Sequence, residues 1–159
     1  MKRRTAIKQL FFLAGGILIA SSCTGDASKA SIALNKVDFS KTDEQLLAEL
    51  VEAIIPQTDS PGAKELSIHL FVMKMVDDCH SEQDQKDFID GLKKAQQLQG
   101  KSQEEIRTYL KNLETNDPFF SILKRRTIMG YENSEYVMKN KLVYQLVPEK
   151  YQGEVKIKA

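Results

Sequence analysis

Few side chains in this sequence could carry out chemistry, and they are scattered. The chain has 159 residues with two cysteines and two histidines, and Cys79 and His80 are adjacent. Adjacent residues on a helix point about 100° apart, and no second Cys or His pair lies at the spacing of a zinc site. We therefore expect no metal site and interpret Cys79 as a core residue. His69 is interpreted as a surface or hydrogen-bonded histidine.

The paired carboxylates also lack a catalytic arrangement. Asp77-Asp78 and Glu104-Glu105 are sequence neighbours on predicted helices, so their side chains diverge, whereas a general acid and base must face one substrate. We interpret both pairs as solvated. The sequence also contains no Gly-rich phosphate loop, no Gly-x-Ser-x-Gly and no His-Glu-x-x-His. The chain is therefore not expected to be an independent enzyme or to carry a cofactor of its own.

Residues 1–22 have the organisation of an export signal. A basic start precedes an uncharged apolar run and then small residues, and the run is too short for a membrane span of about 20 residues. Arg3-Arg4 resembles the start of a twin-arginine signal, with Ala6 where that signal usually has an aromatic residue. We predict export through the twin-arginine translocase, with general secretion as the alternative.

Cys23 follows the small residues directly and resembles the cysteine of a bacterial lipobox. Such a cysteine is lipidated and becomes the new N-terminus. The prediction is a periplasmic lipoprotein anchored to the membrane, while ordinary cleavage that leaves a thiol at Cys23 is the alternative. Without residues 1–22, the 23 basic residues fall to 19 against 22 acidic ones. A net charge near −3 argues against a nucleic-acid partner.

The remaining sequence predicts an all-α fold, a compact bundle of about five or six helices with an irregular C-terminal tail. Residues 23–41 are small and polar and predict a flexible tether, so the helical domain is expected at 42–159. The second helix should bury a stripe of Ile68, Phe71, Val72, Met75, Val76 and Cys79. The expected N-caps are Thr42 in a capping box with Gln45, Ser60 ahead of Pro61, Ser67, Ser81, Ser102, Asp117 ahead of Pro118, and Ser134.

The segment from Pro56 to Ala63, called the elbow below, joins the first two predicted helices. It contains Pro56, Pro61 and Gly62, so it has little conformational freedom to lose. A partner that binds here would find the backbone nearly preordered. The alternative is a stiff turn between helices without a partner.

Two segments together resemble the gluconate 2-dehydrogenase subunit 3 family. The first reads Leu-Val-Glu-Ala-Ile-Ile-Pro-Gln-Thr-Asp-Ser-Pro-Gly-Ala over residues 50–63 and is followed by Phe71. The second reads Gly-Tyr-Glu-Asn-Ser-Glu over residues 130–135, where Glu132 and Asn133 depart from the family pattern. The resemblance covers most of the chain after Thr42.

The resemblance implies a non-catalytic small subunit bound to a large FAD-dependent oxidoreductase of the glucose-methanol-choline type. The FAD would belong to that partner, which would oxidise a sugar or sugar acid, and a cytochrome c subunit could accept the electrons. This chain would stabilise the large subunit and assist its twin-arginine export. The expected contact residues are Pro56, Thr58, Asp59, Pro61, Gly62, Ala63, Phe71, Gly130, Tyr131, Ser134 and Glu135. The competing class is a stand-alone periplasmic lipoprotein that binds a small ligand between its helices.

Overall fold

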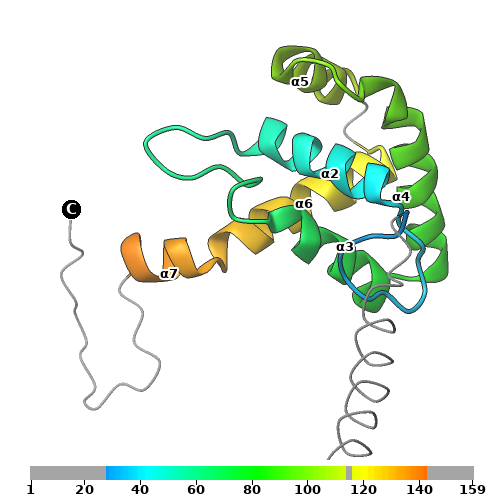
Figure 1. Cartoon of the computed structure of the whole chain (residues 1–159), viewed down its shortest axis with the longest axis horizontal. Helices are drawn as coiled ribbons and strands as arrows, with labels where there is room; N and C mark the ends of the chain where they lie inside the picture. The colour runs from blue at the N-terminus through cyan, green and yellow to red at the C-terminus, as the bar shows by residue number, and fades with distance from the viewer. Residues whose placement is uncertain (1–27, 114–115, 143–159) are drawn as a thin grey trace, which may run out of the picture.

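Six α-helices and one short 3-10 helix make up the regular structure of residues 28–113 and 116–142, the part of the chain that the computed structural model describes (Figure 1). Those residues contain no strand, only an isolated bridge between Lys29 and Ser40. The predicted all-α class is therefore confirmed. The elements are α2 (Lys41–Ile54), α3 (Ile68–Cys79), α4 (Glu82–Ala95), η1 (Gln96–Leu98), α5 (Gln103–Asn112), α6 (Pro118–Glu132) and α7 (Glu135–Asn140).

Four of the predicted helix starts are confirmed by their cap hydrogen bonds. The side chains of Ser81, Ser102, Asp117 and Ser134 each accept a hydrogen bond from the backbone N–H three residues ahead. Such a cap satisfies one of the N–H groups that a helix leaves free at its first turn. Short polar side chains thus set where α4, α5, α6 and α7 begin.

Two predicted caps are wrong because other groups satisfy the backbone. Ser40, and not Thr42, caps α2, since Asp43 completes a capping box with Ser40. Pro61 does not start a helix, because residues 61–62 are irregular, residues 63–67 form turns and α3 begins at Ile68. Ser67 does precede α3, but it has a left-handed backbone (φ 54°) and makes no side-chain cap bond.

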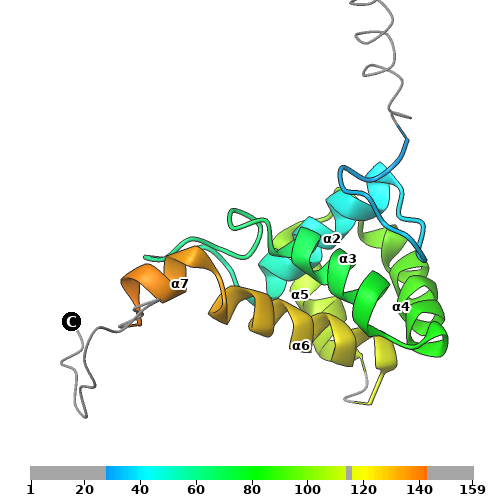
Figure 2. The same cartoon turned by 90° about the horizontal axis from the view of Figure 1, so that it is seen from below.

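The core lies where α6 packs across α3 and α4 while α2 covers it from the other side (Figures 1 and 2). Three aromatic rings link this core, with centroids 6.3 Å apart for Phe39 and Phe88 and 5.2 Å apart for Phe88 and Phe119. A Cβ at Gly91 would collide with Phe119, so only glycine lets α4 approach α6 this closely. The largest fully buried side chains also include Leu47, Leu50, Met73, Leu92, Ile106 and Leu123.

Residues 28–40, called the N-terminal strap below, are packed against the helices and correct the prediction of a flexible tether for this stretch. Val37 and Phe39 are buried in the common core. The Lys41 N–H donates to the Ser28 carbonyl at 2.9 Å, and the Ala30 N–H donates to the Phe39 carbonyl at 3.1 Å. The scattered apolar residues of the strap therefore belong to the fold.

Asp77 holds the strap to α3, which corrects the prediction that Asp77 is solvated. Its side chain is fully buried and accepts the backbone N–H groups of Asn35, Lys36 and Val37 at 2.9, 2.7 and 3.0 Å. Lys74 lies 3.4 Å from the same carboxylate. Burial raises the pKa of Asp77, but the three N–H groups and Lys74 outweigh it and lower the pKa to about 2.

Cys79 is exposed, so its prediction as a core residue is wrong. The buried face of α3 consists of Ile68, Val72, Met73, Val76 and Asp77. The buried face is rotated around the helix axis relative to the predicted stripe, because the strap packs against the side of α3 that carries Asp77. Asp78 and the Glu104-Glu105 pair are exposed, as predicted.

We predict that Asp77→Ala lowers the free energy of unfolding by roughly 3 kcal/mol, because three N–H groups lose their acceptor and Lys74 loses one of its two carboxylate partners. Asp78→Ala is the matched control. Asp78 is exposed and pairs with the same Lys74, so its loss should cost at most about 0.5 kcal/mol. Urea unfolding of both variants measures the difference, and equal losses would contradict the role assigned to Asp77.

The lowered pKa of Asp77 also predicts acid sensitivity. A carboxyl group whose pKa is lower in the folded state stabilises the protein above its unfolded pKa, which is about 3.9 for Asp. For Asp77 this stabilisation, roughly 2 kcal/mol, should be lost as the pH falls from about 5 to about 2. Unfolding curves across that range should show a weaker pH dependence for Asp77→Asn than for the parent chain, whereas parallel curves would argue against the shift.

Candidate functional site

The elbow extends from the helices on the same side of the molecule as α7 (Figures 1 and 2). Backbone hydrogen bonds close it at its base, where the Ala63 N–H donates to the Ile55 carbonyl at 2.9 Å. At its tip the Thr58 N–H donates to the Ser60 carbonyl at 3.0 Å. The elbow is therefore a shaped turn with internal support.

Glu52, on the last turns of α2, clamps both sides of the elbow. Its carboxylate accepts the backbone N–H of Gln57 at 2.8 Å and that of Lys64 at 2.9 Å. A Cβ at Gly62 would collide with this carboxylate and would lie 2.7 Å from the Gln57 nitrogen. Glycine at position 62 is thus required so that the carboxylate can reach both N–H groups. The sequence analysis did not identify Glu52, although it lies inside the motif of residues 50–63.

Tyr131 connects the elbow to α6. Its hydroxyl donates to the Pro61 carbonyl at 3.0 Å and lies 3.3 Å from the Ser60 hydroxyl. The preceding Gly130 is buried, and a Cβ there would lie 2.6 Å from the Phe71 ring. The two segments that carry the family resemblance, 70 residues apart at this hydrogen bond, therefore meet in the fold.

The predicted contact residues separate into an exposed and a buried group. Pro56, Thr58 and Asp59 are exposed, and so is Glu135. Pro61, Phe71, Tyr131 and Ser134 are partly buried, whereas Gly62, Ala63 and Gly130 are buried. The buried residues shape the elbow and its seat on α6, and the exposed tip is what another protein can touch.

The α6–α7 end adds apolar surface beside Tyr131. Among the described residues, the exposed large hydrophobic side chains are Ile128, Met129 and Leu142. Ile128 lies one turn before Tyr131 on α6, and Leu142 directly follows α7. Ser134 caps α7, whose Glu135 pairs with Lys139. Apolar patches at such positions are typical of protein contacts.

His69 lies on the first turn of α3, next to the elbow. It is partly buried, and its Nδ1 has no hydrogen-bond partner among the described residues. Burial lowers the pKa of His69, the nearby Glu44 raises it, and Lys64 lowers it. The net effect is a lowered pKa, with burial as its largest cause.

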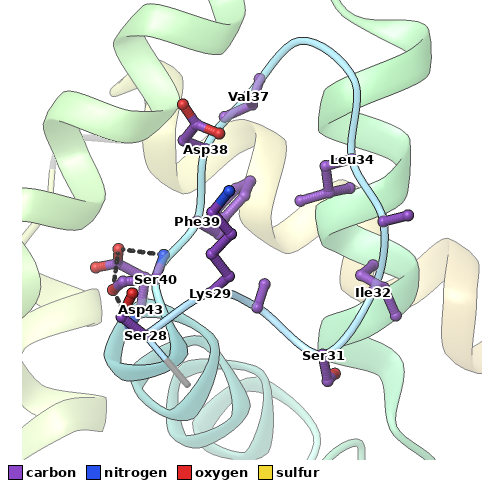
Figure 3. A pocket seen from close by; sticks show the side chains of 12 residues that line it. Ser28, Lys29, Ser31, Ile32, Leu34, Val37, Asp38, Phe39, Ser40 and Asp43 are labelled. Carbon is purple, nitrogen blue, oxygen red and sulfur yellow. Dashed lines mark hydrogen bonds between the residues drawn. The ribbon is translucent and has the colours of Figure 1, made fainter. Parts of the chain in front are cut away.

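The N-terminal strap encloses a hollow of about 680 Å³ (Figure 3). The strap itself forms most of the wall, including Leu34, Phe39 and Lys29, and the first turn of α2 contributes Asp43. Ser40 and Asp43 bond to each other there, at 2.6 Å between the hydroxyl and the carboxylate. Their polar groups are thus used in the helix cap and do not converge on the hollow.

Arg3, Arg4 and Cys23 lie outside the residues that the structure describes, as does the predicted C-terminal tail from residue 143 onward. Their roles stay predictions. Within the described ranges no group of three His, Cys, Asp or Glu side chains is placed to hold a metal ion. None of the helices in that part of the chain is long and apolar enough to cross a membrane.

We predict that Glu52→Ala loosens the elbow without unfolding the helices. The backbone N–H groups of Gln57 and Lys64 lose their acceptor, and each such loss costs about 1 to 3 kcal/mol. Their amide hydrogen exchange should therefore speed up by roughly tenfold or more. Glu65→Ala, at an exposed position on the other side of Lys64, is the control and should leave both rates unchanged. Unchanged exchange in Glu52→Ala would rule out the clamp.

Comparison with known proteins supports the resemblance. No curated protein and no solved structure matches the chain. A family model described as gluconate 2-dehydrogenase subunit 3 matches residues 41–108. That range contains α2, the elbow, α3, α4, η1 and the first part of α5, and it ends before Tyr131. Over residues 41–108 the chain is therefore similar to the gluconate 2-dehydrogenase subunit 3 family, as its sequence predicts.

Proposed function

We propose that this chain is the non-catalytic accessory subunit of a flavin-dependent sugar or sugar-acid dehydrogenase. The observation that carries the proposal is the hydrogen bond from the Tyr131 hydroxyl to the Pro61 carbonyl, 3.0 Å long. It joins the elbow, which lies inside the family match, to the second motif, which lies outside it. The two motifs that carry the resemblance thus belong to one surface.

The surface suits a protein partner because its backbone is already ordered. Glu52 fixes two N–H groups of the elbow, and Tyr131 fixes one carbonyl. Binding then costs little ordering of the chain, and a few exposed side chains can supply most of the affinity. Thr58 and Asp59 offer polar groups at the tip, and Ile128 offers apolar area on α6, one turn before Tyr131.

In this proposal the partner is a large oxidoreductase of the glucose-methanol-choline type that holds the FAD. A subunit that binds only the folded partner stabilises it by mass action. The twin-arginine signal would carry both subunits across the membrane, with Cys23 as the lipid anchor and a cytochrome c subunit as a further partner. This chain would thus supply a docking surface for the large subunit, the export signal and the membrane anchor.

A stand-alone ligand-binding lipoprotein has weaker support. The hollow under the strap has a volume of about 680 Å³, but the strap turn forms most of its wall. A ligand site usually has a few convergent polar groups. Here Ser40 and Asp43 already bond to each other.

We predict that the double variant Thr58→Ala/Asp59→Ala weakens binding to the flavoprotein without lowering the stability of this chain. Both side chains are exposed, and their hydrogen bonds stay within residues 58–60. A central contact should lose about 1 to 3 kcal/mol of binding free energy. The measurement is the amount of FAD that copurifies with the affinity-tagged chain from membranes of its native host, together with the melting temperature of each variant.

Asp38→Ala is the matched control, since Asp38 is exposed on the strap, away from the elbow. It should leave both the bound FAD and the melting temperature unchanged. If no FAD copurifies with the parent chain, the proposed function is wrong. If FAD copurifies equally with the parent and the double variant, the accessory role stands and the elbow tip is not the contact.

A further inference from the structure

The strap determines how far the folded domain can move from a lipid anchor at Cys23. The chain joins the fold at Ser28, whose carbonyl accepts the Lys41 N–H. Five peptide steps separate Cys23 from Ser28 in the sequence. Five fully extended residues span at most about 18 Å. The strap therefore replaces most of a long tether with folded chain.

Several contacts hold the strap in place, so the maximum distance between Cys23 and the folded domain stays short as long as the strap remains packed. The buried Asp77 carboxylate accepts three strap N–H groups, and Glu44 accepts both the N–H and the hydroxyl of Ser31, at 2.6 and 2.7 Å. Val37 and Phe39, which belong to the strap, are buried in the core. Detaching the strap would expose these side chains to water and leave the Asp77 carboxylate without its donors.

The strap and the elbow lie at opposite ends of α2. The strap contacts the first residue of that helix, and the elbow begins two residues after its end. Fourteen helical residues rise about 21 Å. Figures 1 and 2 both show the strap, in blue, at one end of the molecule and the elbow and α7 at the other.

The two ends differ in their exposed apolar side chains, while both carry exposed lysines, such as Lys139 and Lys141 at the α7 end. Lys29, Lys36 and Lys41 are exposed on or next to the strap, and the exposed acids there are Asp38 and, on the neighbouring α4, Glu82 and Asp90. The exposed large hydrophobic residues Ile128, Met129 and Leu142 lie at the α6–α7 end. Lysines near a membrane surface are attracted to anionic headgroups, whereas an apolar patch away from the membrane is available to a protein.

We propose that the strap end of this protein rests against the anionic headgroups of the membrane, and that α2 holds the elbow and α7 away from it. The proposal rests on the lipid anchor at Cys23 in the proposed function. It adds that the short reach from Cys23 to the strap fixes which end faces the lipid. The elbow is then free to receive a large partner without a clash with the bilayer.

The test compares two labelled positions in the full-length lipoprotein on vesicles that contain phosphatidylglycerol. In a Cys79→Ser background, a fluorophore is attached at Lys29→Cys on the strap or at Thr58→Cys on the elbow. Nitroxide groups on the lipid headgroups then quench the nearby label. The expected result is several-fold stronger quenching at position 29 than at position 58.

A second variant tests whether the short connection between Cys23 and the strap causes the difference in quenching. Ten Gly-Ser residues inserted between Asp26 and Ala27 lie outside the packed strap and lengthen the connection roughly threefold. The difference in quenching should shrink strongly in this variant. Equal quenching at both positions in the parent would overturn the orientation, and an undiminished difference after the insertion would overturn the role of the short reach.

The two proposals fail in different ways. A parent chain that does not bind the vesicles, and that carries no lipid by mass spectrometry, would remove both the anchor and the orientation. A lipidated chain on the vesicles with equally quenched labels would remove the orientation alone.

Discussion

Carboxylates that stand on helices and accept backbone N–H groups hold the irregular segments of this fold. Asp77 on α3 binds three N–H groups of the strap, Glu44 on α2 binds Ser31, and Glu52 on α2 binds two N–H groups of the elbow. Irregular backbone cannot satisfy its own N–H groups as a helix does, and a buried unpaired group costs about 1 to 3 kcal/mol. The strap and the elbow keep their shapes because of these three side chains.

The same interactions connect the fold to its proposed function. The elbow has a defined shape because Glu52 and Tyr131 bond it from two helices, and Gly62 and Gly130 make room for these contacts. The glycines of the family motifs therefore act through the structure, whereas Thr58 and Asp59 remain available at the tip. The motif of residues 50–63 here combines a scaffold with a proposed contact surface, and only a small part of it is exposed.

Local signals in the sequence predicted most of the helices correctly. The serine and aspartate caps at Ser81, Ser102, Asp117 and Ser134 depend on neighbours in the chain, and the structure has them as expected. Non-local contacts could not be predicted in this way. Asp77 is buried because backbone 40 to 42 residues earlier supplies its donors, and this contact turns the face of α3 so that Cys79 is exposed.

The candidate site shows the same division. Its residues were predicted from two separate motifs, and the hydrogen bond between Tyr131 and Pro61 shows how these motifs come together. Glu52 was missed because its role depends on the turn that brings Gln57 and Lys64 to one side of α2. The sequence did contain a signal for this contact, because a glutamate one turn before a Pro-rich connection can accept the free backbone N–H groups of that connection.

The measurement that tests the central claim most directly is amide hydrogen exchange on the complex isolated from native membranes, compared with the same chain after the flavoprotein has been removed. We expect binding to slow exchange in residues 57–60 at the elbow tip and in residues 128–136 on α6 and α7, and to leave the strap unchanged. Protection confined to α4, α5 or the strap, with the elbow and the α6–α7 end exchanging as in the free chain, would contradict this account.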